Sequence, residues 1–575
     1  MGQLFEAAWL PAPTTFPELS LGMPSSRANL ARVNFPGTSC RAIGLLLGAA
    51  LLPAADDSVP PAAINGNTIL RHICVLASDE FQGRAPATPG EKLTLDYLVG
   101  EFKRLGVPPA GPGGSYLQPV PLVAILSSAT FSFHAAGHDL DVQPGRDCLA
   151  RSYRPQPLVT VADSDLVFAG YGIVAPEFGL NDYNDVEVRG KTVVLLEGEP
   201  PASAPERTPF RDGANSVHGT PAAKYETAGR RGAAAVLLIP DSKTAFGSLA
   251  NLQGQYRQEA WDLDAPESAR HPAAVEGRLA REAFERLGAA AGLPATALIA
   301  AAGRRDFQPV SLQATARFEI KNEIRRFVSH NVAAQVSGRD PALAGEVVVY
   351  SAHWDHLGMN PALPGDQIYN GAIDNAAGVA QLLEIAGAFA RAARRPARTI
   401  LFIATTAEEK GYLGARHYVT HPLFPPEHTL ANINLDSSNL WGRTTDVLNL
   451  GLGLTSLDET LAATARRQDR TLVTEQFDGG SYFFASDQIE FAKAGIPAVF
   501  PSAGAAYRNQ PAGYGDGKWG EYGARHYHQV TDEVAPDWDL TGTVEDAQWL
   551  WWIGWEIAQA TRHPTWKPGA GFARP

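Results

Sequence analysis

Two segments decide the fold, EVVVYSAHWDH (346–356) and TILFIATTAEE (399–409). Each is a nearly continuous apolar run that ends in imidazole or carboxylate side chains, and such runs are typical of central strands buried on both faces. Between them, AAGVAQLLEIAGAFARAA (376–393) places apolar residues three and four positions apart, which predicts an amphipathic helix. Strand, helix and strand in this order indicate a parallel pair in an α/β sheet.

The alternation continues toward the C-terminus. ANINLDSS (431–438) indicates another short strand, and IEFAKAGIPAVFPS (489–502) a helix, a turn and a strand. VEDAQWLWWIGWEIAQA (544–560) is an aromatic-rich helix, which we interpret as packing against the sheet. The expected fold class is therefore α/β, with a mixed, mostly parallel sheet sandwiched by helices.

The remainder of the 575 residues suggests more than one domain. Segment 68–106 has a helical pattern. From about 120 to 318, short apolar runs are bounded by Gly, Pro and Asp, which is typical of strands. We expect this stretch to form a separate α+β or β-rich domain.

Residues 1–55 are expected to be a leader outside the fold. AIGLLLGAALLPAA (42–55) is an apolar run of signal-peptide length, preceded by three arginines and followed by two aspartates. A disordered tail or a buried segment is the alternative. No other stretch approaches the length of a membrane span, so we expect a soluble exported protein, periplasmic or secreted. Cys74 and Cys148 would remain after cleavage, and the sequence leaves open whether they pair.

Composition and missing motifs exclude several classes of function. The 48 basic and 61 acidic residues give a formal net charge of −13, which disfavours nucleic-acid binding. The chain has no C-x-x-C pair. It also lacks the G-x-S-x-G elbow of serine hydrolases, H-E-x-x-H, a P-loop and G-x-G-x-x-G after a strand.

Metal-ligand types gather where the predicted strands end, the place at which ligands collect in open α/β sheets. The residues at these exits are His353, Asp355, Glu408, Glu409 and Asp436. Asp374 directly precedes the predicted helix, and HYHQVTDE (526–533) offers His526 and His528. Imidazole and carboxylate are ligands suited to divalent zinc.

Each of these features alone has an ordinary structural explanation. A His-x-Asp pair is commonly a structural hydrogen bond, adjacent glutamates are commonly solvated, and an aspartate before a helix is commonly its N-cap. The joint pattern favours a metal site, because burying so many carboxylates together is costly unless cations neutralise them.

The sequence also resembles the di-zinc aminopeptidases and their relatives, among them aminopeptidase Y and the glutamate carboxypeptidases. The motifs that carry this resemblance are, in order, SAHWDHLG (351–358), NGAIDNAAGVA (370–380), TTAEEKGYLGARHY (405–418), INLDSS (433–438), ASDQIEFAKAGIPAVF (485–500) and YHQVTDE (527–533). LASDEFQGRAPATPGE (76–91) is similar to the family's N-terminal catalytic segment.

A domain plan follows from the resemblance, because a protease-associated domain often interrupts the catalytic domain in this family. AGYGIV (169–174), VRGKTVVLLEG (188–198) and AGRRGAAAVLLI (228–239) resemble that insertion. The implied parts are a leader at 1–55, an N-terminal catalytic part at 60–134, an inserted protease-associated domain at 135–320 and the main catalytic part at 321–565.

The resemblance further implies two Zn²⁺ ions per chain and a ligand for each position. His353 and Asp436 would bind one zinc ion, and Asp374 would bridge the two ions. Glu409 and His528 would bind the second ion. This zinc-exopeptidase-like set is complete in the sequence.

Three further residues receive catalytic roles from the resemblance. Glu408 would be the general base that accepts a proton from the attacking water. Asp355 would orient His353 by accepting its ring N–H. Tyr527 would donate to the developing oxyanion.

We therefore expect an exported metallo-exopeptidase that acts on peptide substrates as an aminopeptidase. Alternatives on the same fold are a carboxypeptidase or dipeptidase, and a glutaminyl cyclase that uses one zinc ion. A non-catalytic receptor-like binding protein is the alternative of another class, and the complete ligand set argues against it. The sequence leaves side-chain preference and oligomeric state open.

Overall fold

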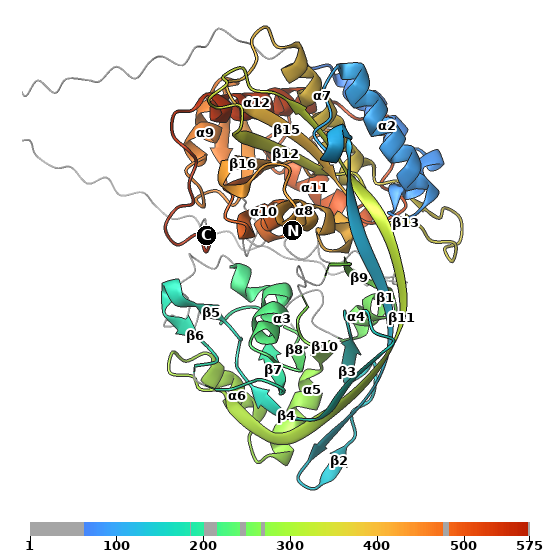
Figure 1. Ribbon diagram of the computed structural model, residues 1–575, viewed down its shortest axis with the longest axis vertical. Coiled ribbons are helices and arrows are strands. Elements are labelled where there is room, and N and C mark those ends of the chain that lie inside the picture. Colours follow the sequence, from blue (N-terminus) through green and yellow to red (C-terminus); the bar gives the residue numbers. More distant parts are fainter. Residues whose placement is uncertain are drawn as a thin grey trace, which may run out of the picture. The chain divides into compact units, whose positions relative to one another are not determined.

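A computed structural model describes residues 63–184, 186–200, 216–241, 249–265, 271–474 and 482–572 (Figure 1). The leader predicted at 1–55 lies outside these residues and stays a prediction. Cys74 is exposed, Cys148 is buried, and both are free thiols, so the two do not pair. None of the described helices is long and apolar enough to cross a membrane.

The C-terminal sheet is centred on β12. Its strands are, in spatial order, β18 (Thr471–Val473), β17 (Asp446–Leu450), β19 (Ala498–Ala503), β16 (Thr429–Asn434), β12 (Val347–His353), β15 (Thr399–Thr405) and β11 (Val310–Val336). From β19 to β15 every neighbouring pair is parallel, whereas β17 pairs with β19 and β11 pairs with β15 in the antiparallel sense. The expected mixed, mostly parallel α/β sheet is confirmed.

Helices cover both faces of this sheet. One face carries α7 (Gly378–Arg391) and α12 (Thr541–Gln559), and the other carries α8 (Leu413–Thr420) and α10 (Gln488–Lys493) (Figure 1). Every residue of β12 and β15 is buried, as their apolar runs predict. The aromatic helix predicted at 544–560 is α12, and it packs on α7 and the sheet as expected.

The remaining helices of this half frame the sheet. α1 (Gly66–Leu76) and α2 (Pro89–Leu105) pack on α7, α9 (Asp458–Arg466) packs on α12, and α11 (Tyr514–Arg525) follows β19. Two short strands, β13 (Gly358–Met359) and β14 (Ile368–Tyr369), pair with each other in the loop after β12.

A long two-stranded ribbon joins this sheet to segment 135–320. β1 (Leu117–Ala135) pairs antiparallel with β11 along its whole length. The last residues of β11 pair with β15, and its first residues pair with β4 (Leu158–Phe168). The boundary predicted at 320/321 therefore falls inside a continuous strand. All described residues belong to one compact unit, and the protease-associated assignment of 135–320 stays a prediction.

Segment 135–320 is a mixed α/β structure in which helices alternate with strands, so it is less purely β-rich than the short apolar runs suggest. Its sheet runs β4, β7 (Thr192–Leu196), β8 (Ala235–Ile239), β10 (Val275–Leu279) and β3 (Cys148–Arg151), with the first four parallel. The other elements are β2 (His138–Leu140), β5 (Val174–Ala175), β6 (Leu180–Asn181), β9 (Ala260–Leu263), α3 (Pro221–Arg230), α4 (Leu249–Tyr256), α5 (Arg281–Ala290) and α6 (Ala295–Ala302).

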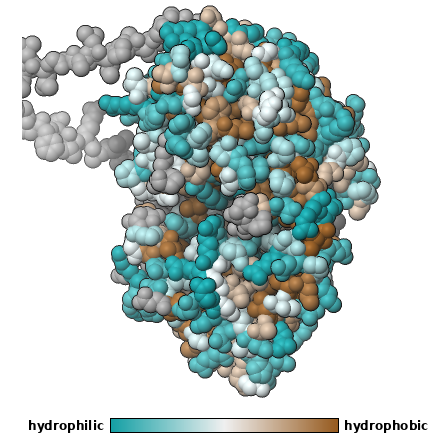
Figure 2. Space-filling view, in the orientation of Figure 1, coloured by the Kyte–Doolittle hydropathy of each residue, from teal (hydrophilic) through white to brown (hydrophobic). Residues whose placement is uncertain are grey.

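The face of the molecule in Figure 2 is largely hydrophilic, with apolar residues interspersed between polar ones. This agrees with the charged composition of the chain and its net charge of −13.

Helix α12 can approach the sheet closely only because residue 554 is a glycine. A Cβ atom at Gly554 would lie 2.0 Å from the hydroxyl oxygen of Tyr350, which is buried and donates to the carbonyl of Leu550 at 2.7 Å. We predict that Gly554→Ala lowers the free energy of unfolding by about 1–3 kcal/mol through overpacking. Gly517→Ala, in α11 with nothing within 4 Å, should raise it by about 0.5–1 kcal/mol. Urea denaturation checks both, and equal effects would contradict the close-packing argument.

Candidate metal centre

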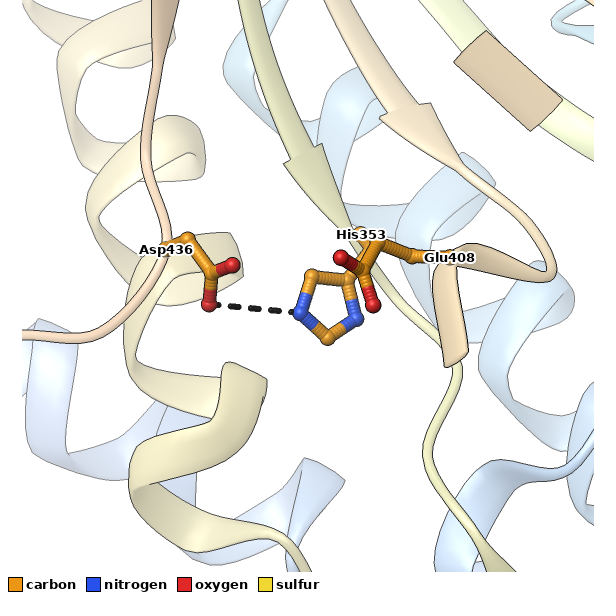
Figure 3. A group of neighbouring side chains, drawn as sticks. All are labelled: His353, Glu408 and Asp436. Atoms are coloured by element: carbon orange, nitrogen blue, oxygen red, sulfur yellow. Dashed lines mark hydrogen bonds and ion pairs between the residues drawn. The ribbon is translucent and has the colours of Figure 1, made fainter. Parts of the chain in front are cut away.

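The strands of the C-terminal sheet end in the polar residues that the sequence singles out. β12 ends at His353, and β16 is followed by Asp436. β15 is followed by Glu408 and Glu409 in the short helix η8 (Glu408–Lys410). Because parallel neighbours end at the same edge of a sheet, these side chains meet there. Figure 3 shows His353, Glu408 and Asp436 close together at this edge.

Two further candidates reach this edge from outside the strands. Asp374 lies in the single turn η7 (Ala372–Ala377) that leads into α7, and His528 lies in the loop after α11. The backbone N–H of Gly378, the first residue of α7, donates to Oδ1 of Asn375 at 3.0 Å, so Asp374 does not play the capping role that its position allows. His526 lies apart, with its Nδ1 atom 2.9 Å from the carbonyl oxygen of Thr531.

The donor atoms form two groups that share Asp374. Oδ1 of Asp374 and Oδ1 of Asp436 each lie 3.3 Å from Nε2 of His353. Oδ2 of Asp374 lies 3.0 Å from Nε2 of His528, and Oε2 of Glu409 lies 3.2 Å from the same nitrogen. Ligand atoms at 2.0–2.1 Å from a tetrahedral zinc ion lie about 3.3 Å apart, so the donor type and spacing of both groups fit the ion.

Strained backbone positions aim three of these side chains. Ala407 before Glu408 has φ 52°, Ser437 after Asp436 has φ 89°, and His528 itself has φ 55°. Left-handed backbone is uncommon for residues other than glycine and clusters at functional sites. The strain therefore marks the three loops that deliver donor groups to the sheet edge.

Side-chain to backbone hydrogen bonds tie the loops to one another. Nδ2 of Asn375 donates to the carbonyl of Leu435 at 2.9 Å, and Oδ1 of Asn375 accepts from the backbone N–H of Ser437 at 3.0 Å. Asp532 accepts from the backbone N–H of Asp374 at 3.1 Å and from that of the preceding residue at 3.0 Å. The loop of Asp374 is thus held from both sides.

Asp355 lies behind His353, but its carboxylate does not take the ring N–H. Nδ1 of His353 is 3.0 Å from the backbone carbonyl oxygen of Asp355 and 4.0 Å from its Oδ1 atom. Oδ1 instead accepts from the backbone N–H of Glu408 at 3.1 Å. The predicted orienting role of the carboxylate is therefore corrected: the backbone carbonyl faces the ring, because the carboxylate is engaged with the loop that carries Glu408.

Electrostatics sets Glu408 apart from the donor groups. Burial raises the pKa of Glu408 well above its usual value, against the attraction of His353, and the carboxylate of Asp436 raises it further. Its carboxylate oxygen lies within 4.8 Å of the donor atoms of His353 and Asp436. A carboxylate placed beside the metal-ligand groups in this way can act as a proton acceptor.

Asp436 and its neighbour Asp487 are supported from the loop before α10. The hydroxyl of Ser486 donates to Oδ2 of Asp436 at 2.7 Å, which leaves Oδ1 toward His353. Asp487 is fully buried and accepts a hydrogen bond from the hydroxyl of Thr405. Burial raises the pKa of Asp487 to about 7.

A buried arginine from the N-terminal segment stands behind the cluster. The guanidinium of Arg84 donates to the carbonyls of Leu76 and Asn370 at 2.6 Å, Gly371 at 2.8 Å and Trp354 at 3.0 Å. It is 1% exposed. Burial lowers the pKa of Arg84 to about 10, and the surrounding carboxylates oppose that shift, so the side chain stays a cation at neutral pH.

Sequence reasoning did not assign Arg84, Ser486 or His356 to the site, although all three lie inside motifs that carry the family resemblance. His356 lies one position after Asp355, and its Nδ1 atom is 2.6 Å from Oε1 of Glu409. Its presence in the same strand exit as His353 is the signal that could have identified it.

A cavity of about 490 Å³ opens onto the cluster. Apolar side chains such as Leu448, Leu450 and Phe500 line it, together with Val217 from segment 135–320. Tyr527 also lines the cavity, and its ring stacks on that of His528 with 3.9 Å between the centroids. The cluster is therefore accessible to a ligand of the size of a short peptide end.

Imidazole and carboxylate groups at the strand exits of an α/β sheet are suited to holding a divalent metal ion. Residues 331–551 match the model of Peptidase family M28, and this range contains every ligand and catalytic residue that the sequence predicts. This part of the chain is therefore similar to the peptidases of family M28. No curated protein sequence matches the chain.

Several solved structures are similar to the chain. An aminopeptidase from Aneurinibacillus sp. strain AM-1 shares 17% identity at a TM-score of 0.44, over 87% of this chain and 95% of that chain. A zinc aminopeptidase from Bacillus subtilis shares 17% at a TM-score of 0.41, over 86% and 96%. A peptidase M28 precursor from Shewanella amazonensis shares 16% at 0.38, over 87% and 94%. Likenesses this low carry no argument about the chemistry of this chain.

Burial of Asp487 leads to a prediction about pH. Its carboxyl group has a pKa of about 7 in the fold, against an ordinary value of 3.8. The protonated carboxyl therefore contributes stability that is complete below pH 3.8 and is lost as the pH rises through 7. In chelator-treated protein, the wild type should therefore lose stability between pH 5 and pH 8. Asp487→Asn should reduce this loss in the free energy of unfolding by about 1 kcal/mol or more.

Denaturation with urea at the two pH values measures this difference. The exposed Asp469 provides the control, because asparagine tolerates its left-handed backbone. If the pH profile of Asp487→Asn matches those of the wild type and of Asp469→Asn, burial does not raise the pKa of the Asp487 carboxyl group.

Proposed function

We propose that the chain is an exported aminopeptidase that holds two zinc ions and hydrolyses N-terminal residues from peptides. The observation that carries the proposal is the division of Asp374, whose two carboxylate oxygens each face a different histidine at 3.3 and 3.0 Å. A carboxylate placed in this way can serve two ions at once.

The chain's own residues supply the ligands for both positions. His353 and Asp436 would hold one ion and Glu409 and His528 the other, with Asp374 shared between them. When bound, the two ions would lower the pKa of a water molecule and polarise the scissile carbonyl. Arg84 cannot replace them as a counter-charge at the open side of the cluster, because backbone carbonyls surround its guanidinium.

Glu408 and Tyr527 would carry the proton transfers and the charge stabilisation. Glu408 would accept the proton of the attacking water and pass it to the leaving amine, because its carboxylate lies beside the donor atoms of His353 and Asp436. Burial also raises the pKa of the Tyr527 hydroxyl, so the group stays protonated and can donate to the oxyanion of the tetrahedral intermediate.

The charges that line the cavity favour a free amino terminus over a free carboxylate. Among its described lining residues are Asp374, Glu408 and Asp436, and no arginine. Lys493 is the one lysine of this described lining, and it is paired with Glu490 at 3.0 Å. With two zinc ions in place the carboxylates that hold them are neutralised, and Glu408 and Asp516 are the acidic groups of the described lining left to attract an α-ammonium group.

The alternatives have weaker support. A carboxypeptidase or dipeptidase needs a cation for the substrate's C-terminal carboxylate. A glutaminyl cyclase with one zinc ion leaves the second donor group without a role, and a receptor-like binding protein leaves both groups and Glu408 without one. Export to the periplasm or the medium is proposed from the apolar leader alone.

The first test removes the proposed base. Glu408→Gln should lower kcat by about 10²–10⁴-fold, because the amide cannot accept the proton of the water. Zinc content, measured by elemental analysis, should stay unchanged because the ligands are intact. The exposed Glu427→Gln is the matched control and should leave kcat unaltered. A Glu408→Gln enzyme that keeps the wild-type rate would remove Glu408 from the mechanism.

The second test concerns the free amine. Aminoacyl p-nitroanilides should be cleaved about 10–100-fold faster, in kcat/KM, than their N-acetylated forms, because a blocked amine loses a charged hydrogen bond to the lining. C-terminal glutamyl peptides with a blocked N-terminus and N-terminal glutaminyl peptides complete the panel. Cleavage of only the N-blocked peptides would identify a carboxypeptidase, and release of pyroglutamyl products a cyclase.

A further inference from the structure

We infer that His356 is a positioning residue that holds Glu409 by one carboxylate oxygen and so presents the other oxygen to the second metal position. The inference rests on the proposed two-zinc function and adds a residue to it. His356 comes from the same strand exit as His353, so β12 would serve both metal positions.

The two oxygens of Glu409 are divided between two histidines. Oε1 lies 2.6 Å from Nδ1 of His356, and Oε2 lies 3.2 Å from Nε2 of His528. The second acid of this position, Asp374, is closer to His528 at 3.0 Å than to His356 at 3.8 Å. Asp374 and Glu409 therefore both turn a donor oxygen toward His528.

The spacing favours a hydrogen bond from His356 over a role as metal ligand. His356, Asp374 and Glu409 offer donor atoms within 4.8 Å of one another, so the three could by themselves form a metal-binding group. Two ligand atoms on one tetrahedral zinc ion lie about 3.3 Å apart. The separation of 2.6 Å between Nδ1 and Oε1 is instead close to the length of a charge-assisted hydrogen bond.

The ring of His356 is held tightly against the loop of Asp374. His356 is fully buried, and a Cβ atom at Gly371 would lie 2.5 Å from its Cδ2 atom. Gly371 has φ 57°, so both its conformation and the space beside the ring require glycine. The ring cannot turn away from Glu409 without displacing this loop.

Within the described part of the chain, the other ring nitrogen of His356 has no hydrogen-bond partner. The carboxylates of Glu409 and Asp374 are thus the polar contacts seen for this side chain. The shorter of the two is the contact with Glu409, at 2.6 Å.

The hydrogen bond has a direct consequence for the carboxylate of Glu409. The last torsion of a glutamate side chain has only broad preferences, so the plane of the carboxylate must be set by its partners. Without the ring N–H, Oε1 of Glu409 would be buried and unpaired, since the side chain is 3% exposed. Loss of such an outer partner typically weakens metal binding by about 10–100-fold.

Two substitutions separate the donor from the bulk of the ring. His356→Phe keeps a ring of similar size and removes the donor. His356→Asn places an amide N–H close to the position of Nδ1. His428→Asn is the matched control, because His428 is exposed and directly precedes β16, at the edge of the sheet opposite the strand exits.

The experiment is a zinc titration of metal-free protein against a chelating indicator, with circular dichroism to monitor the fold. The wild type and His428→Asn should bind two zinc ions. His356→Phe should bind the first ion with unchanged affinity and the second about 10–100-fold more weakly, and His356→Asn should lie closer to the wild type. Saturating zinc should restore most of the kcat of His356→Phe.

The outcomes distinguish the inference from the function on which it rests. A wild-type chain that binds no zinc refutes the proposed function, and the role of His356 with it. If the wild type binds two ions and His356→Phe binds both equally well, only the role of His356 is refuted. Equal weakening of both ions in His356→Phe and His356→Asn, or loss of the folded circular dichroism spectrum in both, would also overturn it, because either result shows a structural role.

Discussion

The constraint on which this structure depends is the burial of several carboxylates at one edge of a sheet. These are Asp355, Asp374, Glu408, Glu409, Asp487 and Asp532, with Asp436 partly exposed beside them. Burial of unpaired carboxylates is strongly unfavourable, and three features of the structure offset this cost. Imidazoles face the donor oxygens, the fixed cation of Arg84 lies behind them, and the two donor groups have the spacing that zinc ions would occupy.

The same constraint explains why the surrounding loops are tied so closely. Arg84 joins the N-terminal segment to the loops of Trp354 and Gly371, Asn375 joins the loops of Asp374 and Asp436, and Ser486 holds Asp436. A carboxylate that moved by an ångström would lose its compensating partner. The left-handed backbone at Ser437 is one of the positions held by these contacts, because its N–H donates to Asn375.

Much of the site could be predicted because strand exits are readable in sequence. The apolar runs that end at His353 and before Glu408 form neighbouring parallel strands, so their polar exits meet. The role of Asp355 could not be predicted, since a carboxylate can bond either to a ring N–H or to a nearby backbone N–H, and only the path of the loop decides which. His356 was overlooked for a related reason. Its proposed role depends on a contact with Glu409, which is 53 positions away in the sequence.

The sequence by itself determined the α/β class, the order of strands and helices, and the residue types at the strand exits, because apolar periodicity and local motifs are properties of short segments. Only the tertiary structure decided which oxygen of Asp374 faces which histidine, that Arg84 lies behind the cluster, and that β11 runs unbroken past the domain boundary predicted at 320/321. These features depend on distances between segments far apart in the chain. Local sequence does not encode such distances, because the packing of the whole core sets them.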